Sequence, residues 1–182
     1  MTDNLPDIRI TLAKIQDASA VLAFEAENRA FFEQWVAGRG DAYYDLSAVK
    51  TSLERAQHAA QIQSEFHYLA WAGSEIVGRV TLRHIEREHF NKAELGYRFS
   101  QRHTGRGYAS QAVEKVLEQA FKELRLWRVE ASVIENNLGS RAIMRKNGFR
   151  QYGHAHAAVL RHGKWMDLLH FEKHATPAPQ GN

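Results

Sequence analysis

Two glycines and two arginines lie close together in Arg102-His-Thr-Gly-Arg-Gly107, directly before a helix-patterned segment. A helix N-terminus presents free N–H groups and positive dipole character. Glycines at 105 and 107 allow the backbone to curl so that successive N–H groups point inward, and Arg102 and Arg106 add positive charge. The segment predicts a cradle for a phosphate group. The alternative is an ordinary strand-to-helix turn with solvated arginines.

The spacing around this loop excludes two common phosphate sites. A dinucleotide-binding fold would place glycine or alanine where Ser110 stands. It would also place an acidic residue at the end of the next strand, whereas Glu130 lies in the middle of its predicted strand. A P-loop requires Gly-Lys-Ser/Thr, which does not follow the glycines. The expected anion therefore belongs to another class of ligand.

Composition limits the class of protein. The chain has 182 residues, 44% of them hydrophobic and 25% charged, which suits one globular domain with a sizeable core. It contains no cysteine, so disulfides, thiolate metal sites and cysteine nucleophiles are excluded. A net charge of +3 is too small to indicate direct nucleic-acid binding. Because we find no bilayer-length apolar run and no signal pattern, we expect a cytoplasmic protein without a membrane partner.

Hydrophobic periodicity predicts a mixed α/β domain over residues 1–173, followed by a disordered tail over 174–182. The clearest helix follows the glycine loop, since apolar residues recur along one face from Val113 to Leu124. The other helices are expected at 18–29 with an Asp17 cap, from a Ser47 cap onward, and at 138–147 ending at Gly148. Strands are expected at 8–14, 92–100 and 126–134, with hairpins at 66–85 and 154–171 that turn at Gly73-Ser74 and His162-Gly163.

Several motifs, in order, resemble the GNAT acyl-CoA acyltransferases. Arg102 to Gly107 matches the family's Arg/Gln-x-x-Gly-x-Gly/Ala signature. The later block over 133–153 looks like the family's Asn-x-x-Ser followed by a helix and Lys-x-Gly-Phe; its matching residues are Asn137, Ser140, Lys146, Gly148 and Phe149. The segment 93–100 resembles the strand before the family's loop. The segments 126–133 and 161–171, and the aromatic stretch over 27–36, resemble the RimJ/RimL branch, the ribosomal-protein N-terminal acetyltransferases. The likeness spans roughly residues 8–172.

This resemblance implies the GNAT fold, with a mostly antiparallel mixed sheet that is flanked by helices and splayed where coenzyme A binds. It implies acetyl-CoA as cofactor and no metal. A backbone N–H near Tyr97–Phe99 would polarise the thioester carbonyl. The coenzyme-binding residues carried over are Tyr97, Arg98, Phe99, Arg102, His103, Thr104, Gly105, Arg106, Gly107, Tyr108, Ala109, Asn137 and Ser140.

Acetyl transfer to an amine needs a proton donor for the leaving thiolate and a base for the amine. Many GNAT enzymes have a tyrosine for the thiolate where this chain has Met144, so Ser140 is the expected donor, unless it is an ordinary first-turn serine. Glu94 is the expected base, its pKa raised by partial burial, with Glu130 as the alternative. The alternative is that either carboxylate only forms surface ion pairs with neighbouring arginines.

The expected acceptor is the N-terminal α-amine of a ribosomal protein. Alternatives are a small amine, amino acid or antibiotic, or a non-catalytic module that binds acyl-CoA. His154 and His156 share a strand face, but no third ligand stands at a metal-binding spacing, so we expect no metal site. The sequence is compatible with a monomer or a homodimer.

Overall fold

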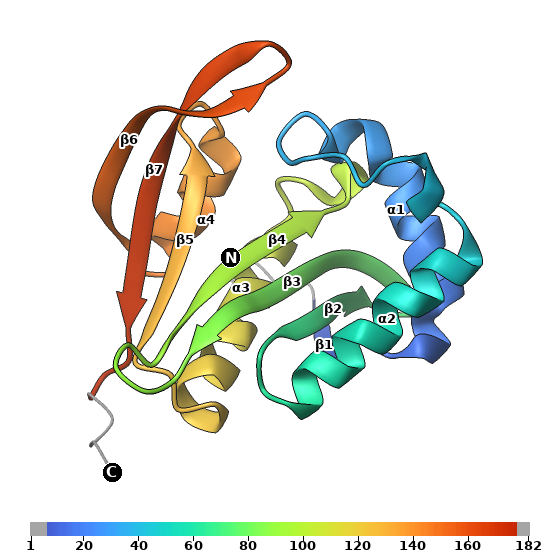
Figure 1. The fold of residues 1–182 in the computed structure, drawn as a ribbon, viewed down its shortest axis with the longest axis horizontal. Coiled ribbons are helices and arrows are strands. Elements are labelled where there is room, and N and C mark those ends of the chain that lie inside the picture. The colour runs from blue at the N-terminus through green and yellow to red at the C-terminus, as the bar shows by residue number, and fades with distance from the viewer. Residues whose placement is uncertain (1–6, 178–182) are drawn as a thin grey trace, which may run out of the picture.

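A computed structural model describes residues 7–177. Its centre is a seven-stranded sheet with the order β1-β2-β3-β4-β5-β7-β6 (Figure 1). Neighbouring strands are antiparallel except β4 and β5, which run parallel. The strands are β1 (Arg9–Leu12), β2 (Phe66–Ala72), β3 (Glu75–Glu86), β4 (Lys92–Phe99), β5 (Arg128–Ile134), β6 (Arg150–Arg161) and β7 (Lys164–His174).

Helices cover both faces of the sheet (Figure 1). Helices α1 (Ala18–Phe32) and α2 (Leu46–Gln61) pack on one side, which we call the α1 face; α3 (Tyr108–Glu118) and α4 (Leu138–Lys146) pack on the other, the α3 face. Short 3-10 turns lie at Ile15–Asp17, Asp41–Tyr43 and Gln101–His103, and a π-helical turn extends α3 over Gln119–Glu123. None of the helices within residues 7–177 is long and apolar enough to cross a membrane. The mixed α/β class expected from the sequence is confirmed.

The sheet separates two hydrophobic cores because successive side chains of a strand point to opposite faces. In β2, Tyr68 and Ala70 join the larger core with α3, whereas Leu69 joins the smaller core with α1 and α2. All three are almost fully buried. β2 is therefore apolar on both faces.

Most expected elements are present, with local corrections. Helix α1 continues to Phe32, three residues past its predicted end at residue 29. The cap of α2 is Asp45 rather than Ser47: its carboxylate accepts the Ser47 N–H at 2.8 Å and the Ser47 hydroxyl at 2.5 Å. Asp17 precedes α1 but does not cap it, because its carboxylate accepts the Lys14 N–H instead.

The C-terminal hairpin is longer than expected at both ends. β6 begins at Arg150, and β7 runs to His174, the first residue of the predicted tail. The turn at His162-Gly163 is confirmed, and both residues have positive φ, 47° and 76°. Residues 178–182, the end of that tail, lie outside the described residues.

One close approach in this sheet can be tested by stability. Gly78 of β3 lies opposite Phe99 of β4, and a Cβ on Gly78 would come within 2.1 Å of the Phe99 ring. A Cβ on Gly96, also in β4, would meet nothing within 4 Å. We expect Gly78→Ala to lower the free energy of unfolding by about 1–3 kcal/mol through overpacking. Gly96→Ala should leave the free energy of unfolding unchanged or raise it by up to roughly 1 kcal/mol, because alanine loses less backbone entropy on folding than glycine does.

Chemical denaturation of both variants measures the difference. Equal stability of the two would contradict the packing of Phe99 across Gly78.

Candidate active site

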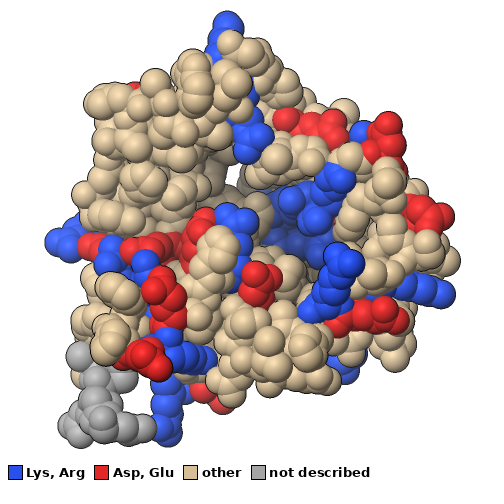
Figure 2. All heavy atoms as spheres, in the orientation of Figure 1, with Lys and Arg blue, Asp and Glu red and all other residues tan. Residues whose placement is uncertain are grey.

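The two central strands separate partway along their length. β4 and β5 pair at Lys92↔Arg128, Ala93↔Val129 and Glu94↔Glu130, and the described strands pair no further. Beyond that point β4 stays with β3 and β5 stays with β7. Figure 2 shows an opening through the molecule between these two halves. The splay expected from the sequence is confirmed.

Backbone donors of β4 face this opening. The Ser100 N–H donates to the Val77 carbonyl of β3 at 2.9 Å, so it points toward β3. Because N–H groups alternate along a strand, those of Phe99 and Tyr97 point to the opposite edge, from which β5 has departed. A strand that has lost its neighbour keeps free N–H donors at that edge. Such donors can polarise a carbonyl that lies between the strands.

The glycine loop lies between the end of β4 and the start of α3. Gly105 and Gly107 have φ values of 75° and 81°, a left-handed conformation that favours glycine. A Cβ on Gly105 would meet nothing within 4 Å, so the backbone there borders open space. The buried Asn28 of α1 anchors the loop by accepting the Gln101 N–H at 2.9 Å. The loop therefore fits a phosphate group beside the free N–H groups of the first turn of α3.

The hydroxyls of Tyr97 and Ser140 meet on the α3 face of the opening. Their oxygens are 2.5 Å apart, although the residues lie 43 positions apart in the chain. Asn137 caps α4 by accepting the Ser140 N–H at 3.0 Å, which fixes Ser140 in the first turn. Burial raises the pKa of Tyr97 to about 12, and the hydrogen bond with Ser140 acts in the opposite direction. Both groups therefore keep their protons at neutral pH.

Met144 is fully buried in the larger core. Its side chain serves packing at the position where the family pattern led us to expect a tyrosine. The hydroxyl of Tyr97, from β4, is an additional candidate proton donor that the sequence did not indicate. Its partnership with Ser140 depends on the packing of α4 beside β4, which no local pattern reports.

Of the other residues expected to bind the coenzyme, two arginines are held in ion pairs, and the rest lie at the loop or in the first turn of α3. Arg102 forms ion pairs with Glu27 of α1 and Glu75 of β3, so of the two loop arginines only Arg106 remains in the described structure to add charge at the glycines. Arg98 points to the α1 face and contacts Glu25 at 3.1 Å. The remaining residues line the loop or the first turn of α3: the His103 ring packs edge-on against Tyr108, the Thr104 hydroxyl donates to the Gln101 carbonyl, and Ala109 lies within α3.

The raised pKa expected for Glu94 is wrong. Partial burial would raise the pKa of this carboxyl, but Arg83 at 2.5 Å and His84 at 3.0 Å outweigh burial and hold it below its ordinary value. Glu130, its register partner on β5, is also ion-paired, with Arg128 at 2.7 Å and Lys92 at 3.2 Å. Both carboxylates lie on the α1 face at the point where the strands separate.

An imidazole on the same face was not identified from the sequence. His170 of β7 is the register partner of Ser132 of β5, two residues beyond Glu130, and its Nδ1 lies 3.0 Å from the Ser132 hydroxyl. Histidine is the side chain whose ordinary titration range lies nearest neutral pH. His170 and Ser132 are 38 residues apart, so their meeting depends on strand order alone.

The histidine pair on β6 gains a third partner in the structure. Asp167 of β7 has one carboxylate oxygen 2.9 Å from His154 Nε2 and 2.8 Å from His156 Nδ1. Its other oxygen accepts the N–H of Ala157, which lies at a bulge with φ of 47°. Three groups are therefore close enough to hold an ion, contrary to the expectation that a third ligand is lacking. The same hydrogen bonds also have a structural explanation, because they join β6 to β7 across the bulge.

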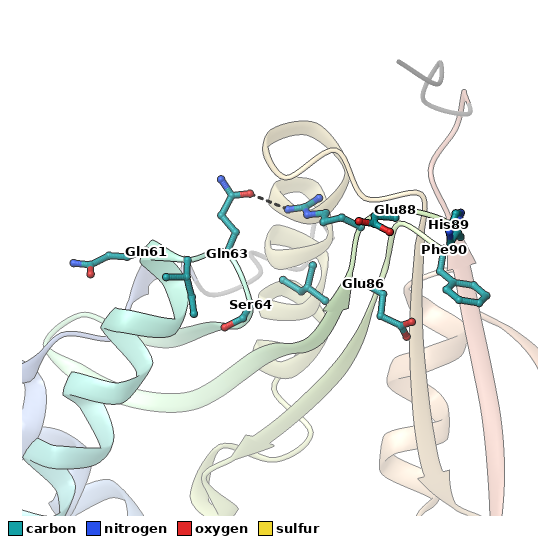
Figure 3. Close-up of a pocket in the computed structure, with 10 residues that line it drawn as sticks. Gln61, Gln63, Ser64, Glu86, Glu88, His89 and Phe90 are labelled. Atoms are coloured by element: carbon teal, nitrogen blue, oxygen red, sulfur yellow. Dashed lines mark hydrogen bonds between the residues drawn. The ribbon is translucent and has the colours of Figure 1, made fainter.

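One recess lies away from the opening. It has a volume of about 760 Å³ and lies between the end of α2 and the β3–β4 connection, as Figure 3 shows for Gln61, Ser64, Glu88 and Phe90. This connection precedes the start of β4, whereas the glycine loop follows its end. A second recess of about 350 Å³ lies between the α1–α2 connection and the tip of the β6–β7 hairpin.

The similarity of this chain to known proteins agrees with this geometry. The model of the acetyltransferase (GNAT) domain matches residues 8–150. "Probable N-acetyltransferase YjcK" of Bacillus subtilis is 35% identical over 85% of this chain and 86% of that protein.

Two solved structures share the fold. The ribosomal-protein-S5-alanine acetyltransferase of Vibrio fischeri has a TM-score of 0.91 and 23% identity, over 95% of this chain and 96% of its own. Mycobacterium smegmatis RimJ in complex with CoA-disulfide has a TM-score of 0.87 and 23% identity, over 96% of this chain and 85% of its own. From its sequence match over most of its length and its closely similar architecture, the chain belongs to the GNAT acetyltransferase family.

Proposed function

We propose that this enzyme transfers the acetyl group of acetyl-CoA to the N-terminal α-amine of a ribosomal protein. Acetyl transfer and acetyl-CoA follow from the family, which needs no metal. The observation that carries the proposal is the opening between β4 and β5, which joins the glycine loop on one side to the α1 face on the other. On the α1 face the 350 Å³ recess lies between two surface segments, which suits an extended chain end. The similarity to an S5-alanine acetyltransferase supports the same acceptor class.

When bound, acetyl-CoA supplies an activated acetyl group. In the proposed mechanism the glycine loop and the first turn of α3 hold the pyrophosphate, and the N–H groups of Tyr97 and Phe99 polarise the acetyl carbonyl. The Tyr97–Ser140 pair protonates the leaving sulfur. His170 takes the proton of the acceptor amine through Nε2, since Nδ1 faces Ser132. Glu94, held ionised by its ion pairs, orients the amine.

A panel of acceptors tests the proposed function. Release of free thiol from acetyl-CoA is followed with N-terminal peptides of ribosomal proteins, with free amino acids and with small amines. We expect turnover with peptides. Turnover confined to small amines would show that the acceptor is a small amine and not a protein N-terminus. Coenzyme binding without any thiol release would indicate a non-catalytic module.

The first prediction concerns the phosphate cradle. Gly105→Ala and Gly73→Ala both place a Cβ at positive φ, 75° and 59°, where nothing lies within 4 Å, so both carry similar strain. Only Gly105 lies in the cradle. We expect Gly105→Ala to weaken acetyl-CoA binding at least about tenfold in calorimetry, because the methyl group occupies the space a diphosphate needs. Gly73→Ala, in the β2–β3 turn, should bind as the wild type does. Equal affinities of the two variants would overturn the assignment.

A second prediction concerns the leaving sulfur. Ser140→Ala and Tyr97→Phe should each lower kcat by roughly 10²-fold and leave acetyl-CoA affinity near that of the wild type, since the hydroxyls act as charge develops on sulfur. Because the two oxygens form one unit, the double variant should lose little more than the poorer single variant. Losses that multiply, or that appear as weaker coenzyme binding, would contradict a shared proton-donor role.

The pH dependence of kcat/KM separates the two candidates for the base. For His170→Gln, a loss of about 10²-fold at pH 7 should shrink above pH of about 8, where an α-amine already arrives neutral. For Glu94→Gln, the profile should stay parallel to that of the wild type, because a carboxylate with a lowered pKa is ionised throughout this range. Convergence of the Glu94→Gln profile at high pH, with a parallel His170→Gln profile, would make Glu94 the base.

A further inference from the structure

Three arginines on the α1 face surround one buried carboxylate. The side chain of Glu25 in α1 is fully buried, and its oxygens lie 2.5 Å from Arg79, 3.1 Å from Arg98 and 3.5 Å from Arg39. These arginines come from β3, β4 and the α1–α2 connection. Arg79 also donates to the Tyr43 hydroxyl at 3.1 Å. No local sequence pattern indicates this group, because its members lie up to 73 residues apart.

The group carries more positive than negative charge. Arg79 and Arg98 stand directly opposite each other in the β3–β4 register, an arrangement that repels unless a counter-charge intervenes. Glu25 supplies one negative charge against three positive charges, which leaves a formal excess of two in this group. A single buried ion pair would need one arginine, so the second and third are not required to neutralise Glu25.

Burial and the neighbouring charges shift the pKa values of the residues in this group. Burial alone would raise the pKa of the Glu25 carboxyl, but the three guanidinium groups outweigh it and hold that pKa below its ordinary value. Burial, and after it the neighbouring positive charges, lower the pKa of Arg98 although Glu25 opposes them. The pKa of Arg79 is raised although burial opposes it, because Glu25 and Tyr43 outweigh burial there. Glu25 therefore stays ionised among the arginines, and the formal excess of positive charge remains.

The arginines remain accessible from the α1 face. The Arg79 side chain is only 7% exposed, but those of Arg98 and Arg39 retain 20% and 28% of their surface. Figure 2 shows basic side chains along the deep wall of a hollow on this face. An anion entering the hollow can meet the exposed sides of Arg98 and Arg39 while Glu25 stays behind them.

The group borders both the opening and the second recess. Arg98 follows Tyr97 in β4, so their Cα atoms are about 3.8 Å apart. Arg39 lies between Gly38 and Gly40, which line the recess beside Arg161. The Nε atom of Arg161 is buried and has no hydrogen-bond partner within the described part of the chain. Positive charge therefore continues from the opening toward the hairpin tip.

We propose that the arginine group formed by Arg39, Arg79 and Arg98 is a subsite for a carboxylate of the acceptor, supplied by an acidic side chain one or two residues behind the reacting amine. One or two residues of extended chain span roughly 3–7 Å, which suits the separation between an amine at the opening and a carboxylate at Arg98. The inference rests on the proposed function and narrows it: the enzyme selects chain ends that carry Asp or Glu near the α-amine. Charge-assisted hydrogen bonds to arginine supply the selectivity.

Binding and turnover of two matched peptides test this subsite. The peptides differ only in Asp or Asn at the second and third residues, and binding to the enzyme with CoA is measured by calorimetry, without turnover. We expect the wild type to bind the Asp peptide about tenfold more tightly, and KM to follow the same order. Arg39→Gln should reduce this preference to about twofold. Arg55→Gln, the same charge change on the exposed side of α2, should leave it intact.

Two results would overturn the subsite: equal binding of both peptides by the wild type, or an equal loss of preference in Arg39→Gln and Arg55→Gln, which would reflect net charge alone.

Failure of the proposed function gives a different result from failure of the subsite. If neither peptide is acetylated, free amino acids are compared with their carboxamides in the same variants. If the wild type prefers the free acid and Arg39→Gln removes that preference, the subsite is supported with a small acceptor. If the wild type shows no such preference, the subsite is overturned.

Discussion

The parallel pairing of β4 with β5 lasts for three residue pairs, and the site depends on its ending there. A gap inside a sheet is costly unless each strand keeps another neighbour, because its backbone groups lose their partners. Here β3 holds β4 from Glu94 to Phe99, and β7 holds β5 along its whole length. The two strands can therefore diverge without unravelling, and free N–H donors remain at the edge of the gap.

Different helices and strands place functional side chains on the two faces of the gap between β4 and β5. On the α3 face, α4 brings Ser140 to the Tyr97 hydroxyl, and the glycine loop starts α3 beside the end of β4. On the α1 face, His170 of β7 lies beside Ser132 of β5, and the arginine group comes from β3, β4 and the α1–α2 connection. In the proposed function, donor and acceptor therefore approach one point from opposite faces of a single sheet.

Features encoded by neighbours in the chain were predictable. The glycine loop and both hairpin turns depend on residues within a few positions, and the structure contains all of them, whereas the caps expected at Asp17 and Ser47 are wrong. The missed features join distant residues through strand order or helix packing: Tyr97 with Ser140, Ser132 with His170, and Glu25 with its arginines. Glu94 shows the same limit, since its position on β4 was evident but its ion pairs depend on the register with β3. A carboxylate's pKa follows from those partners, and its strand position alone does not reveal them.

The most direct test of this account is to record backbone amide NMR shifts of the full chain as CoA is added. Binding at the glycine loop and the strand opening should shift the amides of Gly105, Gly107, Tyr97 and Phe99 and leave that of Gly73 unchanged. Shifts concentrated instead around Gln61–Ser64 and Glu86–Phe90, the residues of the 760 Å³ recess, would place the coenzyme at the other end of β4 and contradict the account.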